Sequence, residues 1–278
     1  MCGIIGVTGR EQALPKLIEG LRRLEYRGYD SAGVATVTNG QINRLRANGK
    51  IANLAALADS EPLGGLAGIG HTRWATHGRP SEKNAHPHSD GRVVLVHNGI
   101  IENYIDLRAE LEASGRLFTT ETDTEVIVHL ISTLIEAGKP PREAVVLALR
   151  KLQGAFALAI MFAGCDNLII GARRGCPLAI GYGTKQMFLG SDALALAPFT
   201  GAISYLEEDD WVELTPEGAQ IFNSENVQVD REVRPIASSG YTSSKGEFAH
   251  FMLKEIYEQP SVIGDALASL LNPVQRTV

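Results

Sequence analysis

The sequence is poor in cysteine, and it has neither a run of basic residues nor a long apolar segment. Its three cysteines, Cys2, Cys165 and Cys176, are too few for a disulfide framework in a chain of 278 residues, which fits a reducing cytoplasm. The net charge of -6 argues against nucleic acid as a partner. The longest apolar run, residues 154–164, is too short to span a bilayer, and the first residues do not resemble a signal peptide. We therefore expect a soluble cytoplasmic protein with no membrane or nucleic-acid partner.

What the sequence does have is a cysteine directly behind the initiator methionine. Cysteine is small enough for an aminopeptidase to remove Met1, which would give Cys2 a free α-amine beside its thiol. A thiol is a weak nucleophile until a base takes its proton, and an α-amine has a pKa near ~7.7–8.0. One residue would then carry both nucleophile and base, as in N-terminal nucleophile enzymes. Residues 3–7 predict a buried strand that holds Cys2 rigidly. The alternative is that the position of Cys2 has no chemical meaning.

Hydrophobic periodicity and turn signals predict the order of the elements. Helices are expected at residues 11–25, 50–58, 101–114, 122–135 and 141–152. Strands are expected at residues 3–7, 32–38, 41–47, 66–72, 93–96, 155–162, 167–173, 178–183, 187–191, 202–206, 210–214 and 219–222. The strands do not alternate with helices as in a parallel sheet. This order favours an α+β fold in which two packed, mostly antiparallel sheets are covered by helices on both sides.

The predicted elements also suggest how the chain divides. Residues 2–222 would form one domain, and residues 223–278, which are polar and weakly periodic, would form a tail and the start of a linker. Thr122 and Glu125 have the spacing of a capping box at the start of a long helix.

Four positions in loops combine side chains that suit a catalytic site. Arg73 lies in a loop rich in hydrogen-bond donors, where its guanidinium could bind a carboxylate through two parallel bonds. Asn98 and Gly99 could supply a side-chain amide and a backbone N–H to an oxyanion hole, or they could form a plain turn. Asp123 could bind a ligand ammonium, or it could only stabilise the start of a helix.

Two further motifs contain residue types found in metal or cofactor sites. His86 and His88 form a histidine pair in a loop, but no second cluster of metal ligands accompanies them. We interpret them as histidines that structure the loop. The glycine cluster at residues 65–70 has the wrong order for a dinucleotide-binding loop and opens no helix. We therefore predict neither a metal nor a cofactor.

Taken together, the motifs resemble those of the class II glutamine amidotransferases. The resemblance covers nearly the whole chain, and within the family it points to the glutaminase half of the hexosamine-forming members. It implies the four-layer αββα fold of the N-terminal nucleophile hydrolases. The segments that carry it are Cys2–Ile4, Arg22–Gly33, His71–Gly78, Asn84–His88, His97–Asn103, Glu121–Val126 and Lys254–Pro260.

The resemblance implies catalytic roles for residues at three of these motifs. Cys2 would be the nucleophile and its α-amine the base, while Asn98 and the N–H of Gly99 would form the oxyanion hole. Arg27 would line the pocket of the nucleophile. The expected reaction is hydrolysis of the side-chain amide of L-glutamine to glutamate and ammonia through a Cys2 thioester.

The resemblance also implies how L-glutamine would be bound. Arg73, helped by Thr76 and His77, would bind its α-carboxylate. Asp123 would hold its ammonium group together with the carbonyl of residue 99. Trp74 would lie on a mobile loop that closes the site.

In the hexosamine-forming members, a sugar isomerase region that binds fructose 6-phosphate follows the glutaminase half, and the full enzyme is expected to be a homodimer. We expect that region to be absent from this sequence, which stops at Val278 inside the connecting segment. Two alternatives remain. One is an amidotransferase subunit that serves a different acceptor. The other is a glutamine-sensing module that retains Met1 and is not an enzyme.

Overall fold

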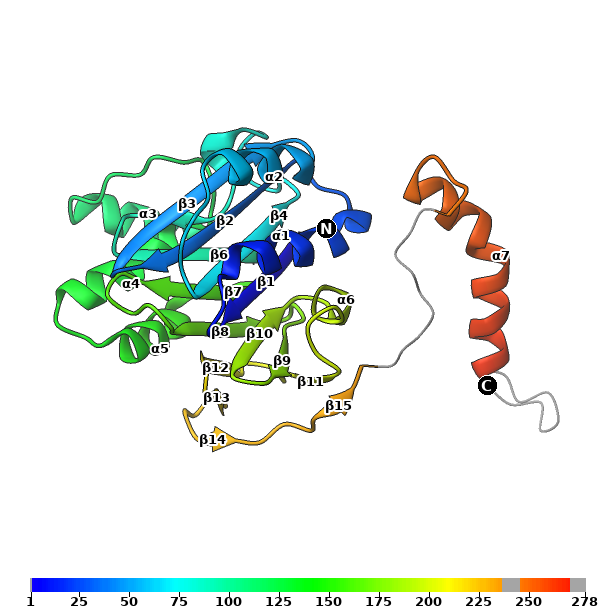
Figure 1. The fold of residues 1–278 in the computed structure, drawn as a ribbon. Helices are drawn as coiled ribbons and strands as arrows, with labels where there is room; N and C mark the ends of the chain where they lie inside the picture. Colours follow the sequence, from blue (N-terminus) through cyan, green and yellow to red (C-terminus); the bar gives the residue numbers. More distant parts are fainter. Residues whose placement is uncertain (1, 237–245, 271–278) are drawn as a thin grey trace. The chain divides into compact units, whose positions relative to one another are not determined.

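The computed structural model describes residues 2–236 and 246–270, with the backbone alone for residues 264–270 (Figure 1). The chain separates into two compact units, Met1–Ala237 and Ser238–Val278. The first unit contains two β-sheets and six α-helices among its described residues, and the second contains one long helix.

The first sheet has eight strands, and every pair of neighbours in it is antiparallel. Its order is β15-β11-β9-β10-β1-β4-β2-β3. The bounds of these strands are β1 Gly3–Thr8, β2 Ser31–Thr38, β3 Gln41–Asn48, β4 Ala67–Arg73, β9 Ala179–Gly183, β10 Gln186–Gly190, β11 Ala202–Tyr205 and β15 Arg234–Pro235. Strand β1 is therefore hydrogen-bonded on both sides, which fixes the position of Cys2 at its start.

The second sheet has seven strands in the order β14-β13-β12-β8-β7-β6-β5, again with antiparallel neighbours. The bounds of these strands are β5 His88–Ser89, β6 Val93–Ile101, β7 Gly154–Phe162, β8 Ile169–Arg174, β12 Trp211–Thr215, β13 Gly218–Phe222 and β14 Gln228–Val229. The longest pairing in this sheet is between β6 and β7, in which Gly99 lies opposite Phe156.

The two sheets pack face to face because alternate side chains of each strand point to opposite faces. In β7, Ala157 and Ala159 belong to the cluster between the sheets, whereas Leu158 and Ile160 belong to the cluster under the helices. In β1, Ile4 faces the other sheet, whereas Ile5 belongs to the cluster between the first sheet and its helices. Small residues on the inner face let the sheets approach closely.

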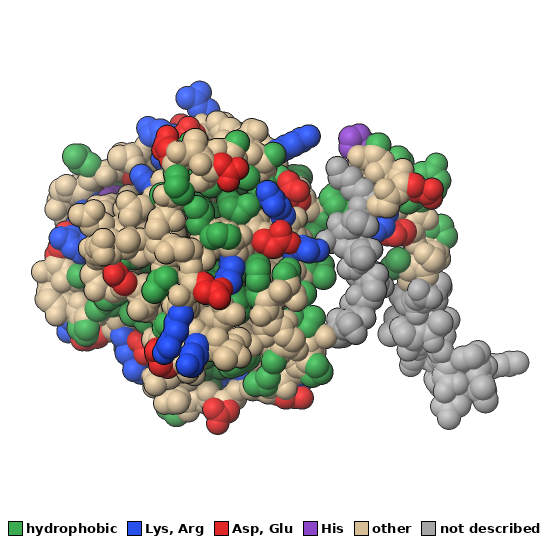
Figure 2. Space-filling view, viewed as in Figure 1, with side chains coloured by type: hydrophobic (Ala, Val, Ile, Leu, Met, Phe, Trp, Pro, Cys, Tyr) green, Lys and Arg blue, Asp and Glu red, His purple; other side chains and the backbone are tan. Residues whose placement is uncertain are grey.

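Helices cover both outer faces and complete a four-layer αββα arrangement, as the sequence predicts (Figure 1). The first sheet is covered by α1 Ala13–Arg23, α2 Ile51–Ser60 and α6 Ala193–Leu196. The second is covered by α3 Tyr104–Ala113, α4 Glu125–Glu136 and α5 Pro141–Lys151. Two short 3₁₀ turns, Glu25–Arg27 and Glu82–Asn84, lie in the loops. Acidic and basic side chains are interspersed over the face shown in Figure 2.

Two predictions about local structure are wrong, and one of two alternatives is excluded. Asn98 and Gly99 lie inside β6 and do not form a turn, because the strand continues to residue 101 and pairs with β7 along its whole length. The predicted capping box is absent, because the Glu125 carboxylate accepts from the N–H groups of Thr119 and Thr120 and not from that of Thr122. The predicted last strand at 219–222 is followed by two more, β14 and β15.

The second unit is dominated by α7, Phe251–Leu270, a helix that the sequence analysis does not place. Several of its apolar side chains are exposed, among them Met252, Ile256 and Tyr257. None of the described helices is long and apolar enough to cross a membrane.

Candidate active site

Cys2 lies at the start of β1, beside the end of β4. Because Gly3 pairs with Thr72, the side chain of Cys2 lies next to the loop that follows β4. The thiol Sγ accepts the backbone N–H of Trp74 at 3.2 Å, and it lies 3.5 Å from the Trp74 carbonyl oxygen. Burial raises the pKa of the Cys2 thiol, and the Trp74 N–H only partly opposes this shift. A buried thiol that stays protonated needs a base before it can attack.

The predicted oxyanion donors reach Cys2 from β6 of the second sheet. The side-chain nitrogen of Asn98 donates to the Cys2 carbonyl oxygen at 3.4 Å. Gly99 has a φ of 121°, and a Cβ at this position would lie 2.0 Å from the carbonyl oxygen of Ala155. Only glycine fits both the torsion and the space, so the path of the backbone beside Cys2 depends on this residue.

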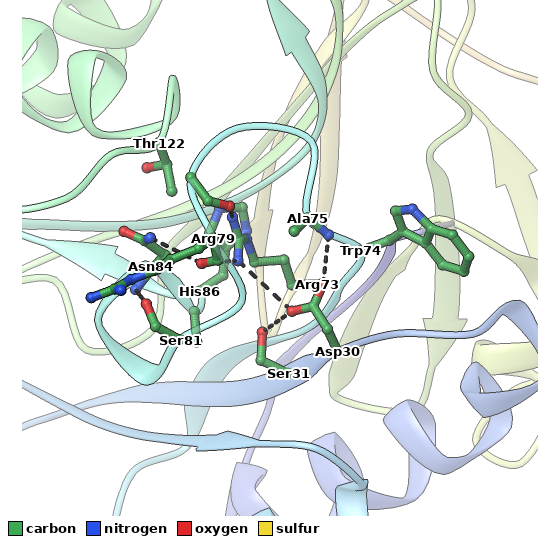
Figure 3. A network of polar contacts seen from close by, with 12 residues as sticks. Asp30, Ser31, Arg73, Trp74, Ala75, Arg79, Ser81, Asn84, His86 and Thr122 are labelled. Atoms are coloured by element: carbon green, nitrogen blue, oxygen red, sulfur yellow. Dashed lines mark hydrogen bonds and ion pairs between the residues drawn. The ribbon is translucent and has the colours of Figure 1, made fainter.

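Arg73 is almost completely buried and holds the loop that follows it. Its Nη2 atom donates to the carbonyl oxygens of His77 at 2.6 Å and Gly78 at 3.0 Å, and Nη1 donates to that of Arg79 at 3.4 Å. The Asp30 carboxylate lies 3.7 Å from the same guanidinium (Figure 3). The loop therefore curls around the arginine that is predicted to bind the substrate carboxylate.

Asp30, directly before β2, supports the same loop. Its carboxylate accepts the N–H of Ala75 at 2.6 Å and the hydroxyl of Ser31 at 2.8 Å, and its own N–H donates to the Arg73 carbonyl (Figure 3). The backbone on both sides of Trp74 is thus fixed, although 54% of the Trp74 side chain is exposed. An exposed indole on a fixed backbone suits a residue that contacts a ligand.

Asp123 lies in the loop before α4 and is almost fully buried. One of its oxygens accepts the N–H of Ile101 at 2.9 Å, and the other lies 3.9 Å from His77 Nδ1. Neither sequence interpretation includes the bond to Ile101, which ties the loop to the end of β6. Asp123 thus helps to hold the strand that carries Asn98, and its second oxygen remains near the Arg73 loop.

Glu125 orders the turn before this loop. Burial alone would raise the pKa of Glu125, but the His129 ring 3.6 Å away and hydrogen bonds from Thr119 and Thr120 outweigh it and hold the pKa well below its ordinary range. The carboxylate therefore stays ionised and fixes residues 119–120, which precede Asp123. The spacing of Thr122 and Glu125 predicts a capping box and gives no sign of the bonds from Thr119 and Thr120.

These segments enclose one small pocket. It is lined by Cys2, Arg73, Trp74, Thr76, His77, His86, His97, Gly99, Thr122, Asp123 and Thr124. Asn98 and Arg27 contact Cys2 at its carbonyl oxygen, each at 3.4 Å, and Arg27 is also paired with Asp192. All nine predicted site residues therefore meet within one region of the structure. The contact of Arg27 is to the backbone of Cys2 and not to its thiol.

Sequence reasoning does not identify several buried residues of this region. His97 and Thr124 line the pocket, and His71 is buried and contacts Asn98. Asn84 donates to the Arg79 carbonyl (Figure 3) and, at 2.8 Å, to the Glu121 carboxylate. His86 and His88 are buried and hydrogen-bonded, which agrees with histidines that structure the loop. Their partners lie far away in the sequence, so no local pattern indicates these contacts.

Comparisons with known proteins agree with the geometry. Residues 71–198 match the family model described as a glutamine amidotransferase domain. The chain is 57% identical over 272 residues to the glutamine–fructose-6-phosphate aminotransferase (isomerizing) of Brucella suis and 55% identical over 278 residues to that of Zymomonas mobilis. The chain belongs to the class II glutamine amidotransferases. It is covered to 98% and 100% in these two matches but spans only 45% and 46% of the relatives' own lengths.

Solved structures of glutamine amidotransferases share this fold. The glutamine phosphoribosylpyrophosphate amidotransferase of B. subtilis, complexed with ADP and GMP, is 27% identical, with a TM-score of 0.70 over 80% of this chain and 49% of that one. A glutamine aminotransferase class-II domain protein from Silicibacter pomeroyi matches with a TM-score of 0.55 at 15% identity and 99% coverage of that chain. The fold is therefore that of the N-terminal nucleophile amidotransferases.

Proposed function

We propose that the chain hydrolyses the side-chain amide of L-glutamine to glutamate and ammonia. The observation that carries this proposal is that one pocket is lined by the Cys2 thiol, the backbone of Gly99, and the opposite charges of Arg73 and Asp123. The α-carboxylate and α-ammonium groups of an amino acid have the same pair of charges. A bound amino acid with its charged end between Arg73 and Asp123 would direct its side chain towards Cys2.

In the first chemical step, the Cys2 thiolate attacks the carbon of the glutamine side-chain amide and forms a C–S bond. Because burial raises the pKa of the thiol, a base must take its proton. In the part of the chain that the structure describes, both hydrogen bonds of Sγ are to the main chain of Trp74, which is not a base. We assign the role of base to the α-amine of Cys2, which is free once Met1 has been removed.

The attack places a negative charge on the amide oxygen. The Asn98 side-chain nitrogen and the Gly99 N–H would stabilise this charge, which is present in the transition state and not in the substrate. The protonated amine then gives its proton to the departing ammonia, and the C–N bond breaks. Water finally cleaves the Cys2 thioester, which releases glutamate and restores the thiol.

We further propose that the chain is the ammonia-supplying half of a glutamine–fructose-6-phosphate aminotransferase. The identity to such enzymes extends over nearly the whole chain, and those relatives are about twice as long. The remaining length of such a relative would hold the sugar isomerase region and bind fructose 6-phosphate, and the full enzyme would be a homodimer. The three free cysteines are consistent with a cytoplasmic location.

The test is release of glutamate and ammonia from L-glutamine by the purified chain, after mass analysis has shown that Cys2 is the first residue. We expect equal amounts of both products, and no release by the Cys2→Ala variant. A wild-type chain with a free Cys2 amine that binds glutamine without hydrolysing it would contradict the proposal and favour a glutamine sensor.

A further inference from the structure

The proposed reaction leaves His71 and the Asn84–His88 motif without a role, although they lie next to the oxyanion donors. His71 is fully buried at the end of β4, and His86 is 5% exposed in the loop before β5. Both belong to segments that resemble the family. A buried polar side chain without a function in packing or catalysis is costly, because its hydrogen bonds must replace those it made with water.

The contacts of His71 determine which of its ring nitrogens carries the proton. Its Nε2 atom lies 3.0 Å from the backbone carbonyl oxygen of His97 and 3.0 Å from the side-chain oxygen of Asn98. A backbone carbonyl can only accept a hydrogen bond, so Nε2 must be the protonated nitrogen. The side-chain atom of Asn98 that faces it must then be the amide oxygen, since the amide nitrogen would present a second donor.

The orientation of the Asn98 amide follows from this. With its oxygen held by His71, the nitrogen of the same amide points to Cys2, where it donates to the carbonyl oxygen at 3.4 Å. We propose that His71 is a positioning residue that fixes the Asn98 side-chain amide with its N–H groups towards Cys2, where the oxyanion of the proposed reaction would form. This inference rests on the proposed function, in which Asn98 stabilises the oxyanion.

The His86 side chain supports the same assignment from behind. Its Nδ1 atom lies 3.2 Å from His71 Nε2, and its Nε2 atom lies 3.1 Å from the Thr124 hydroxyl. That hydroxyl lies 3.0 Å from His97 Nδ1. If His71 Nε2 donates, His86 Nδ1 accepts, His86 Nε2 donates to Thr124, and the hydroxyl of Thr124 donates to His97. The Nε2 hydrogen of His71 is then shared among three acceptors, and the Nε2 atom of His97 has no hydrogen-bond partner among the described residues.

The electrostatics agree with neutral rings throughout this chain. Burial lowers the pKa of His71 to about 3, and it lowers the pKa values of His86 and His97 below their ordinary range. A neutral imidazole has one donor and one acceptor nitrogen, so the tautomer is fixed by its neighbours. A histidine that only filled space would not need its Nε2 hydrogen. If His71 were only a buried core residue, its proton would not have to lie on Nε2.

The kinetic experiment replaces His71 by Phe and by Gln. His71→Phe fills the space without a donor, whereas the amide nitrogen of Gln can occupy the place of Nε2. Because loss of an oxyanion donor costs ~10²–10³-fold in kcat, we expect His71→Phe to lower kcat by ~10–100-fold with little change in KM. His71→Gln should recover most of this loss. The control Tyr182→Phe removes a partly buried hydrogen-bonding group, one that contacts Ser204 between β9 and β11 and does not line the pocket, and should keep kcat within about twofold.

A double variant distinguishes positioning from general damage. If His71 acts through Asn98, the Phe substitution should cost nothing further in the Asn98→Ala background. An undiminished loss in that background, or a His71→Phe variant with wild-type kcat, would overturn the inference. Imidazole nitrogen NMR of the intact chain gives a reading that needs no activity, with the proton of His71 expected on Nε2. A proton on Nδ1 would refute the assignment even if glutamine is hydrolysed, and absence of hydrolysis would instead count against the proposed function.

Discussion

The Nη2 atom of Arg73 donates to the carbonyl oxygen of His77 at 2.6 Å, so the residue predicted to bind the substrate is also bound by its own loop. The guanidinium is planar and has five donors, which allows it to hold the loop and still present an edge to the pocket. A side chain with this double use is already ordered before substrate binds. Less entropy is then lost on binding than with a free arginine.

Arg73→Lys should raise KM strongly and lower kcat less. A lysine ammonium has only three donors at one point and cannot replace the bonds to the loop carbonyls and to the substrate carboxylate. The measurement is the rate of glutamate release over a range of glutamine concentrations. Arg79→Lys, an exposed position on the same loop, is the matched control and should leave KM unchanged. An equal rise in KM in both variants would show that the loop, and not the Arg73 fork, determines affinity.

Asp123→Asn should raise KM for glutamine by weakening the bond to the substrate ammonium. The asparagine oxygen can still accept the N–H of Ile101, so the loop should keep its conformation while the charge is lost. The comparison is with a glutamine analogue that lacks the α-amine. The analogue should be bound equally by wild type and variant. If the substitution costs as much with the analogue as with glutamine, Asp123 serves only the structure.

Asn98→Ala should lower kcat by ~10²–10³-fold and change KM far less, because the amide acts on charge that develops after attack. Steady-state kinetics with glutamine measure both constants. Asn98→Asp is a useful companion, since it keeps the oxygen for His71 but removes the donor. A variant that loses affinity and keeps kcat would place Asn98 in substrate binding and not in the oxyanion hole.

An uncleavable extension before Cys2 should leave the fold intact and abolish hydrolysis. Strand β1 starts at Gly3 and pairs with β4 and β10, so residues added before Cys2 lie outside these pairings and need not disturb them. The extension turns the α-amine into an amide, which is not a base, and general-base catalysis contributes ~10²–10⁴-fold. Thermal unfolding tests the fold, and glutamate release tests activity. Proteolytic removal of the same extension should restore the rate, and full activity with the extension in place would refute the assigned base.

Stability should fall as the pH is lowered from about 7.5 to about 5.5, before most carboxylates titrate. His71 and His88 have pKa values of about 3 in the folded chain against an ordinary value of 6.5. The unfolded chain therefore takes up protons first, and the stabilisation that is complete above pH 6.5 is lost as the pH falls towards 3. Denaturant unfolding at several pH values measures the slope. Each such histidine contributes about half of ~1.4 kcal/mol per pH unit near pH 6.5 and approaches ~1.4 kcal/mol per pH unit well below it, so His88→Phe should reduce the slope by the corresponding amount at each pH.

The strands and the layers could be predicted because they depend on local periodicity. The alternation in β7 and the apolar spacing of α1 are visible in the sequence alone. The end of β6 could not be predicted in this way. Asn98 and Gly99 have the composition of a turn, and only the pairing with β7 keeps them in the strand.

Motifs predict the site residues, and seven of the nine line one pocket while Asn98 and Arg27 contact the backbone of Cys2, but their roles stay predictions and the contacts around them are not predicted by the sequence. The partners of Asn98 and His86 come from β4 and from the loop before α4. Such contacts depend on the packing of one sheet on the other, and nothing in a single sequence encodes a distance between two sheets. The same limit explains Glu125, which reaches back to residues 119–120 although its spacing is that of a capping box.

The position of β1 inside the eight-stranded sheet has a consequence for how the protein is made. Ile5 pairs with Gly70 on one side and with Gly190 on the other. The strand that follows the proposed nucleophile is synthesised early, yet one of its two neighbours, β10, emerges from the ribosome only much later. Pairings between distant parts of a sequence form slowly. One edge of β1 therefore stays unpaired until β10 has been synthesised. A fragment that ends before β10 would leave Cys2 next to an edge strand of an incomplete sheet.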